Sequence, residues 1–243
     1  FTSSVALGLK ASRHDGVYLL NNDMILEKEA LQELLKWRSP QTFAVASQIF
    51  FSRGRRREET GWTAMDFNLG LPFPRHLEPC DPGIVRGTVY AGAGSSLFHR
   101  QPLTQLVGNG APYDPFYWED VDWSVRAWRM GYNVLFCPES KTLHKHRATV
   151  ERYYSEDLIE HVFERNRFNF CVRNPFPRKG FRIAFRAFLK QKPDALADIF
   201  TPRNLPGLFK SRFDAWRAPW WKVDISNLHR QVFRTIPGEK VAT

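Results

Sequence analysis

Cysteine is scarce in this 243-residue chain, which has three, and none has the spacing of a metal site. Cys80, Cys137 and Cys171 therefore indicate a reducing compartment and exclude a disulfide framework. Long apolar runs are also missing, because no window approaches the roughly 18 uninterrupted apolar residues of a transmembrane helix. The chain has no basic-then-apolar leader, so no signal peptide is predicted. It also has no P-loop, dinucleotide fingerprint or internal repeat, which excludes the classes that these patterns define.

Apolar residues make up 43% of the chain and aromatic residues 14%, enough for a substantial core in one large domain or a domain with an appendage. The net charge of +10 is unevenly distributed. Residues 1–150 hold 17 Lys and Arg against 15 Asp and Glu, whereas residues 151–243 hold 18 against 10. The basic character therefore belongs to the second segment, for which anionic lipid headgroups, phosphates and nucleic acid are candidate partners.

The first 50 residues alternate between helical and strand patterns, as in an α/β sheet. The expected elements are a helix over residues 1–12, a buried parallel strand over 17–20, an amphipathic helix over 26–37 and a strand over 43–50. Residues 71–83 contain three prolines and are expected to be irregular. A strand of small residues over 88–98 and a short helix over 102–107 are predicted to follow.

Asn21, Asn22 and Asp23 directly follow the first predicted strand, at the edge where α/β sheets bind ligands. One interpretation is a simple turn, since Asn and Asp side chains hydrogen-bond to their own backbone. The other is a metal site, because Asp23 and an Asn carbonyl offer hard oxygen ligands to Mg²⁺ or Mn²⁺, which in turn hold a diphosphate. Taken alone, the triplet favours the turn.

Residues 113–146 form the stretch most typical of an active site. Aromatic residues lead into Glu119, Asp120 and Asp122, which begin a helical pattern. That helix has an apolar stripe and is expected to end at a glycine: Val121, Val125, Trp128 and Gly131. Asp120 lies off the stripe, so we expect its side chain to face a cleft rather than the core.

These acidic residues have two interpretations. Carboxylates in the first turn of a helix are favourable capping chemistry, and Asp122 is placed to pair with Arg126 on the solvent face. Glu119 and Asp120 fit this interpretation less well, because Trp118 precedes them. An aromatic ring beside two carboxylates suits a pocket that holds a sugar ring against a base.

Histidines follow a predicted buried strand over residues 132–136. His144 and His146 are alternative metal ligands, since a neutral imidazole suits Mn²⁺ better than it suits Mg²⁺. The other interpretation is a structural or exposed histidine near a strand end. A long helix over residues 150–172 is predicted next, and Asn174 and Pro175 end it.

The chain changes character from residue 178. A basic amphipathic helix is predicted there, with aromatic residues opposite basic ones: Phe181, Phe185, Phe188, Arg182, Arg186 and Lys190. Such a helix either lies on a membrane surface or packs on the parent domain with solvated arginines. Three later tryptophans also suit an interface: Trp216, Trp220 and Trp221. No nucleic-acid-binding module is recognisable, so we expect no nucleic-acid partner.

Five motifs follow one another in the order and at the intervals of a known family. Residues 19–23 are similar to its Leu-Asn-Asn-Asp form of the metal-binding Asp-x-Asp motif, and residues 91–100 to its small-residue strand ending in an Arg. Residues 117–132 resemble its Glu-Asp-x-Asp helix and the turn after it. Residues 138–144 resemble the segment that supplies a metal-ligand histidine, and residues 165–166 a later Arg-Asn pair. The chain thus resembles glycosyltransferase family 2, the inverting GT-A group, particularly its bacterial rhamnosyltransferase-like members.

The resemblance implies an α/β fold over residues 1–177, with a GT-A-like (Rossmann-like) mixed sheet flanked by helices. A basic, aromatic-rich helical tail over residues 178–243 is expected to follow. The family begins with a strand–helix–strand unit that binds the nucleotide base, and this chain, which opens at Phe1, is expected to lack it. Val5 and Ala6 also stand where many members have an Asn-Asn pair. We expect a cytoplasmic location, with peripheral attachment to the inner face of the membrane through the tail.

By the same resemblance, Asp120 is expected to be the general base, and Asp23, His144 and Asn21 to hold a divalent metal, Mn²⁺ or Mg²⁺. Contacts to donor and acceptor are expected from Asn22, Trp118, Glu119, Gly94 and Arg100. The implied reaction is inverting transfer of a sugar from a nucleotide diphosphate sugar to a hydroxyl of a cell-surface glycan or lipid-linked saccharide. The alternative is a non-catalytic carbohydrate- or partner-binding fragment, because the base-binding unit is missing.

Overall fold

The structure is a computed structural model that describes residues 1–51, 61–68, 71–77, 83–108, 113–145 and 153–174, with eight further residues between 182 and 197. His146 and the three tryptophans predicted to form an interface lie outside the described residues.

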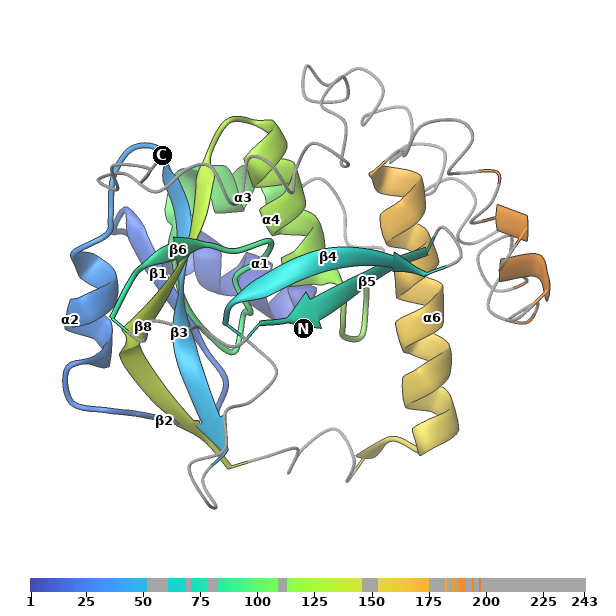
Figure 1. Ribbon diagram of the computed structural model, residues 1–243, viewed down its shortest axis with the longest axis horizontal. Coiled ribbons are helices and arrows are strands. Elements are labelled where there is room, and N and C mark those ends of the chain that lie inside the picture. The colour runs from blue at the N-terminus through green and yellow to red at the C-terminus, as the bar shows by residue number, and fades with distance from the viewer. Residues whose placement is uncertain are drawn as a thin grey trace, which may run out of the picture.

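A six-stranded mixed sheet forms the centre (Figure 1). Its strands run in the order β1 (Gly16–Leu20), β7 (Ser95–His99), β3 (Thr42–Phe51), β8 (Asn133–His144) and β2 (Met24–Leu26), with β6 (Arg86–Gly87) paired to β8. Among the described strands, β3 and β8 pair in parallel, and the other pairs are antiparallel. A separate antiparallel hairpin consists of β4 (Thr63–Asn68) and β5 (Leu71–His76).

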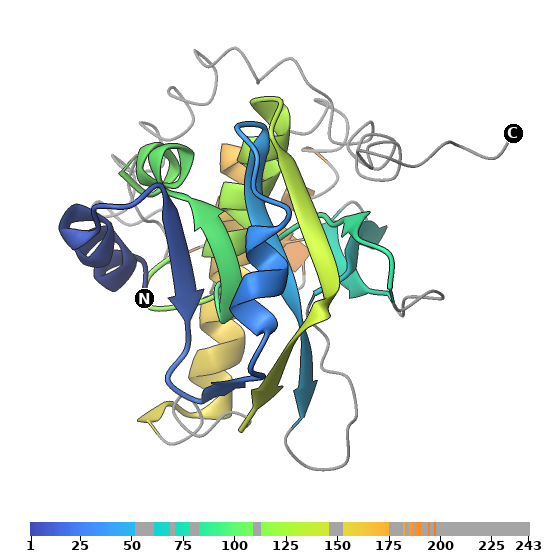
Figure 2. The same cartoon turned by 90° about the vertical axis from the view of Figure 1, so that its left-hand side faces the viewer.

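Helices cover both faces of the sheet, which confirms the predicted α/β class. α2 (Ala30–Leu35) lies on one face, and α4 (Glu119–Arg129) and α6 (Glu156–Arg173) lie beyond the other (Figure 2). α1 (Thr2–Ala11) packs against α3 (Arg100–Gly108), which in turn packs against α4. Successive side chains of β3 point into two different hydrophobic cores, because side chains alternate between the two faces of a strand. Ala44 and Ala46 join the large cluster around α4, whereas Val45 joins Leu34 of α2.

Four sequence-based expectations for the elements are wrong. The strand of small residues expected over 88–98 forms only from Ser95 to His99, as β7. The strand over 17–20 pairs antiparallel with β7, not parallel, and lies at one edge of the sheet. The helix expected over 26–37 forms only from Ala30 to Leu35, because Met24–Leu26 extends along β8 as β2. Residues 71–76, expected to be irregular, form β5. Their prolines, Pro72 and Pro74, lie two residues apart and therefore share one edge of the strand, so their missing N–H groups can both face away from β4.

The apolar stripe of α4 is buried as predicted, with Val121, Val125 and Trp128 at most 5% exposed. Gly131, which follows the last helical turn, has a φ of +89°, the conformation that favours glycine after a helix. The expected solvent face is wrong, however, because ten of the eleven residues of α4 are buried. Asp122 and Arg126 do pair, at 3.2 Å, but they are 1% and 5% exposed and lie inside the protein.

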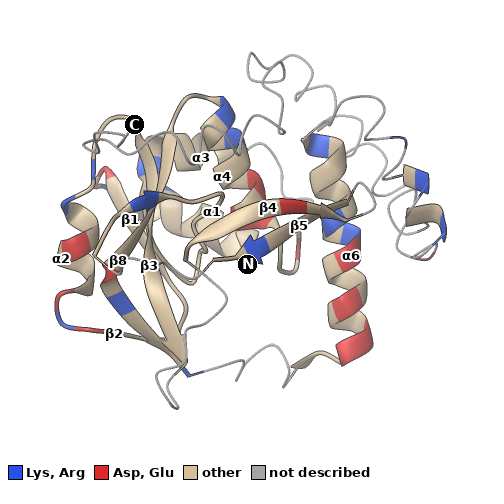
Figure 3. Ribbon diagram, viewed as in Figure 1, with Lys and Arg blue, Asp and Glu red and all other residues tan. Residues whose placement is uncertain are grey.

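α6 begins after Ser155, whose hydroxyl accepts a hydrogen bond from the Leu158 N–H at 3.4 Å, and its C-cap is Asn174, as predicted. Beyond it, the ring of Phe188 packs against Phe168 of α6 at a centroid distance of 5.0 Å. Arg182, Arg186 and Lys190 are exposed (Figure 3 shows basic residues on this helical segment). In the described part of this segment, Phe188 therefore packs on the domain while the basic side chains are exposed. Within the described residues, no helix combines the length and apolar character needed to cross a bilayer.

Candidate active site

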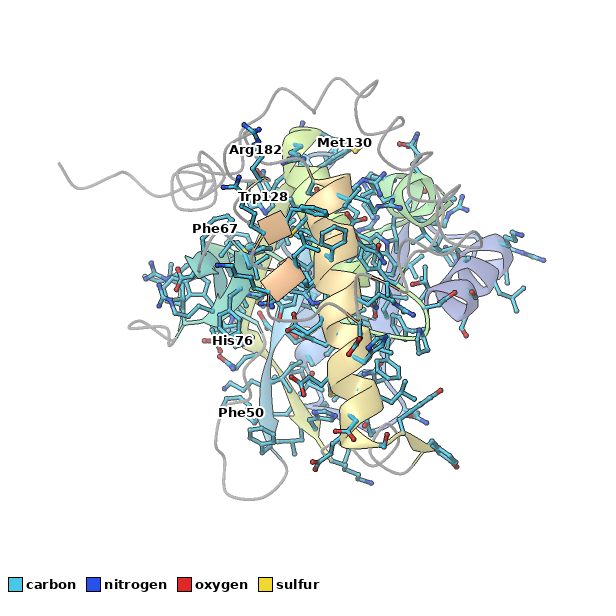
Figure 4. All side chains as sticks on the ribbon, turned by 90° about the vertical axis from the view of Figure 1, so that its right-hand side faces the viewer. Phe50, Phe67, His76, Trp128, Met130 and Arg182 are labelled. Atoms are coloured by element: carbon cyan, nitrogen blue, oxygen red, sulfur yellow. The ribbon has the colours of Figure 1, made fainter. Side chains whose placement is uncertain are left out.

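A cavity of ≈ 510 Å³ brings together segments that are far apart in the sequence. Its walls come from the turn after β1, the start of β7, the hairpin, the first turn of α4 and the end of β8. Figure 4 shows His76 at the lower end of the hairpin, toward Phe50 of β3, with Trp128 and Met130 above it. Asn21, His144, Glu119 and Asp120 are among its lining residues, whereas Asp23 is not.

The Asp120 carboxylate is held by two backbone N–H groups. Oδ1 accepts a hydrogen bond from the Val121 N–H at 2.8 Å, and Oδ2 accepts one from the Ala93 N–H at 3.1 Å. Burial raises the pKa of Asp120, and the hydrogen bonds from Ala93 and Val121 oppose this rise. The result is a partly buried carboxylate whose negative charge is stabilised by fixed donors, which suits a group that accepts a proton.

Glu119 has a different environment from its neighbour. It is 6% exposed, and its Oε2 atom has no hydrogen-bond partner. Burial, followed by the negative charge of Asp120, raises the pKa of Glu119 from 4.5 to about 8. The pKa values of both carboxyl groups are therefore raised, but only Asp120 has backbone donors from Ala93 and Val121 that favour its charged form.

Asp23 and His144 form a second polar centre. The Asp23 Oδ2 and His144 Nε2 atoms lie 3.2 Å apart, and their side chains are 15% and 11% exposed. The antiparallel pairing of β2 with β8 creates this contact, since Met24 lies opposite His144 and the Lys145 N–H donates to the Asp23 carbonyl at 2.9 Å.

The chemistry of this centre fits a divalent cation. Asp23 Oδ1 is buried without a hydrogen-bond partner, so one hard oxygen ligand is available beside an imidazole nitrogen. Asn21 lies in the same cavity as His144 and offers an amide oxygen. Within the described residues no group of three His, Cys, Asp or Glu converges, so the remaining ligands would come from Asn21, phosphate oxygens and water.

One loop connects the two polar centres. The Ala93 N–H donates to Asp120, and the carbonyl of the next residue, Gly94, accepts from the Asn21 N–H at 3.0 Å. A Cβ atom on Gly94 would lie 2.9 Å from Met24 Cε and 3.2 Å from Asn21 Nδ2. Glycine therefore permits the close approach of this loop to the turn after β1.

The other predicted contact residues have different positions. Trp118 lines the cavity but is only 3% exposed, and Asn22 is exposed in the turn. Arg100, like Asn22 and Asp23, is not among the residues that line the cavity. β7 begins beside the cavity and ends at His99, so Arg100 lies beyond its far end, where its N–H donates to the Asp15 carbonyl at 2.8 Å.

Several residues that line the cavity were not predicted as site residues from the sequence. They are mostly aromatic or apolar and come from β3, β5, α6 and two loops: Ile49, Phe73, His76, Phe163, Tyr90 and Phe116. Phe73 and His76 lie in the segment whose prolines predicted irregular structure, and Phe163 lies on α6. Phe73 is 50% exposed and Tyr117 is 37% exposed, so these rings offer accessible aromatic surface at the cavity.

The segment before α4 has an unusual backbone. Tyr117 and Trp118 both have φ of 76°, a left-handed conformation that costs a non-glycine residue about 1–3 kcal/mol. Asn166 of α6 donates hydrogen bonds to three carbonyl groups of this segment. The strained turn directly precedes Glu119 and Asp120, so it determines where α4 begins.

Comparison with solved structures identifies this architecture as GT-A-like, the fold of a class of glycosyltransferases. The crystal structure of GalNAc-T7 with UDP, GalNAc and Mn²⁺ is similar, with a TM-score of 0.60 and 13% identity over 96% of this chain and 44% of that chain. A mannosyltransferase, PcManGT from Pyrobaculum calidifontis in complex with GDP-Man and Mn²⁺, has a TM-score of 0.42 and 15% identity over 96% of this chain and 64% of that chain. This chain therefore spans less than two thirds of either protein. The sequence matches no protein-family model and no curated protein.

Proposed function

We propose that this chain is the catalytic part of an inverting, family 2-like glycosyltransferase that uses a nucleotide diphosphate sugar. The observation that carries the proposal is one cavity lined by Asp120, Asn21 and His144, with the His144 imidazole 3.2 Å from the Asp23 carboxylate. Sugar transfer needs these two functions apart: one group takes a proton, and the other binds the diphosphate. The GT-A-like fold is consistent with this activity but does not define the substrates.

Asp120 is proposed as the general base. Its carboxylate takes the proton of the acceptor hydroxyl while the hydroxyl oxygen forms a bond to C1 of the donor sugar. The bond between C1 and the diphosphate oxygen breaks, and the diphosphate leaves with the electron pair. Because the incoming oxygen attacks from the side opposite the leaving group, the configuration at C1 inverts.

Asp23, His144 and Asn21 would hold a divalent cation, Mn²⁺ or Mg²⁺, whose chemistry when bound is to neutralise the negative charge of the diphosphate. The buried Asp23 Oδ1 atom without a partner supports this assignment. The similar structure of GalNAc-T7 was solved with UDP, GalNAc and Mn²⁺. We propose the same kind of donor here.

The acceptor is proposed to be a glycan or lipid-linked saccharide. Phe73 and Tyr117 expose aromatic surface at the cavity, against which the apolar face of a sugar ring can pack. Glu119, as a protonated carboxyl group, has a hydrogen to donate to a sugar oxygen. The basic tail supports a proposed peripheral attachment to an anionic membrane.

The test is a transfer assay with the purified chain, Mn²⁺, a panel of nucleotide diphosphate sugars and saccharide acceptors. We expect an acceptor to increase the release of nucleoside diphosphate and the product to have inverted configuration at the transferred sugar, as read by NMR. Chelation of Mn²⁺ should abolish release. Saccharide binding without turnover, with every donor tested, would instead identify a carbohydrate-binding fragment.

A further inference from the structure

Asn166 forms three hydrogen bonds with one short segment of the chain. It is fully buried in α6. Its Nδ2 group donates to the carbonyl oxygens of Tyr113 at 2.8 Å, Phe116 at 2.8 Å and Tyr117 at 3.0 Å. These three carbonyl groups belong to the segment that leads into α4.

The orientation of the Asn166 amide follows from its partners. Its Oδ1 atom accepts hydrogen bonds from the Arg165 guanidinium, from Nε at 3.2 Å and from Nη2 at 3.1 Å. Since a guanidinium group only donates and a carbonyl group only accepts, the amide nitrogen must face the three carbonyls. Arg165 also donates to the Asp114 carbonyl, so neighbouring residues of α6 hold the same segment.

This segment needs external support, because Tyr117 and Trp118 are two consecutive left-handed residues with side chains. Aromatic packing supplies part of that support: Trp118 lies at centroid distances of 5.6 Å from Phe163 and 5.1 Å from Phe170, both on α6. Packing of rings limits the position of Trp118 but does not fix backbone carbonyl directions. The Asn166 amide does so through directional hydrogen bonds.

The turn directly precedes the proposed base. The Trp118 carbonyl accepts the Asp122 N–H at 3.0 Å, so the turn sets the direction of the first helical hydrogen bond. Asp120 lies within that first turn, and its carboxylate must meet the Ala93 N–H from another part of the chain. A change in the turn therefore moves Asp120 relative to the cavity.

From these contacts we propose that Asn166 is a positioning residue: its amide fixes the Tyr117–Trp118 turn and thereby the aim of the Asp120 carboxylate. The catalytic part of this inference rests on the proposed function. Asparagine suits the role because one side chain supplies two N–H donors and one acceptor oxygen. An aspartate of the same shape has no N–H and would place its charge against three carbonyl oxygens.

The experiment compares Asn166→Ala and Asn166→Asp with a matched control, Asn174→Ala. Asn174 is also fully buried, but its amide bonds to Asp122, Phe170 and Arg129 rather than to the turn. Sugar-transfer kinetics are measured on the folded fraction of each protein. The chains are also labelled with 5-fluorotryptophan, and the ¹⁹F resonance of Trp118 is assigned by its loss in Trp118→Phe.

We expect both Asn166 variants to lower kcat on the order of 10²-fold, the effect of a small misplacement of a catalytic group, with the donor KM near the wild-type value. The Trp118 resonance should shift or broaden in these variants. Asn174→Ala should lower stability while kcat and the Trp118 resonance stay near wild type. The inference is overturned if Asn166→Ala matches Asn174→Ala in kcat, or if the Trp118 resonance does not change. If the wild-type chain transfers no sugar, the proposed function fails, and the ¹⁹F comparison still decides whether Asn166 holds the turn.

Discussion

The Asp23 carboxylate and the His144 imidazole lie 3.2 Å apart, although 121 residues separate them in the sequence. The β2–β8 pairing brings them together, and the Asp23 Oδ1 atom remains without a hydrogen-bond partner. A buried oxygen of this kind has a cost unless a ligand satisfies it. This unpaired oxygen supports the proposed cation site at the pair.

Asp23→Asn should weaken Mn²⁺ binding by at least about tenfold, because loss of even an indirect partner of a metal ligand costs about 10–100-fold in affinity. Titration calorimetry with Mn²⁺ alone measures this without any donor or acceptor. Asp15→Asn is the control, since Asp15 is an exposed acid just before the other end of β1. Equal Mn²⁺ affinities for the two variants would exclude Asp23 as a ligand.

Glu119 should make the protein less stable as the pH rises. Its pKa in the folded protein is about 8, against 4.5 ordinarily, so the folded state binds more protons than the unfolded state between these values. The free energy of unfolding therefore falls across this window, and Glu119→Gln removes that fall. Urea denaturation between about pH 5 and about pH 9 measures the free energy of unfolding of both proteins. For the wild type it should fall by about 1.4 kcal/mol for each unit by which the folded pKa exceeds the ordinary one.

Glu139→Gln provides the comparison for this experiment, because Glu139 is exposed on β8. Its stability profile should follow the wild type. A Glu119→Gln profile with the same slope as the wild type would mean that Glu119 is ionised at neutral pH.

Asp122 should contribute strongly to stability. Its Oδ2 atom lies 3.2 Å from Arg126 and 3.4 Å from Arg173, and its Oδ1 accepts from Asn174 at 2.6 Å. Burial alone would raise the pKa of Asp122, but Arg173, Arg126 and Asn174 outweigh burial and hold the pKa below 3.8. Asp122→Asn removes a buried charge partner of two arginines and should cost about 3–5 kcal/mol.

The contribution of Asp122 should also depend on pH. Because the folded pKa is depressed, the stabilisation is present above the ordinary value of 3.8 and is lost as the pH falls through the lower folded value. Asp66→Asn is the control, since the Asp66–Arg75 pair at 2.6 Å is about half exposed and should contribute less than about 1 kcal/mol. Similar losses in the two variants at neutral pH would contradict the importance of the buried network.

Local patterns in the sequence predicted some features well. The stripe of Val121, Val125 and Trp128 is buried, and Gly131 ends α4, because helix periodicity and the left-handed preference of glycine act over a few residues. The mixed α/β class followed from the alternation of elements and from the family resemblance. These features need no knowledge of distant contacts.

Long-range packing explains why other sequence-based expectations differ from the structure. The sequence does not reveal that Arg173 of α6 and Asn174 contact Asp122. The Asp122–Arg126 pair was therefore expected in solvent but is buried. It also does not show that β7 runs away from the cavity, so that Arg100, beyond the end of β7, does not line it. The hairpin that supplies His76 was not predicted, because prolines disfavour strands in general. They are nevertheless compatible with the free edge of a strand.

The most direct test of the proposed function is single-turnover sugar transfer by Asp120→Asn, with donor binding measured on the same protein. This substitution removes the proton acceptor while leaving the Asp23–His144 centre unchanged. We expect the transfer rate to fall roughly 10²–10⁴-fold, as for loss of a general base, while Mn²⁺ and the nucleotide diphosphate sugar bind as in the wild type. Transfer at the wild-type rate by this variant would contradict the account.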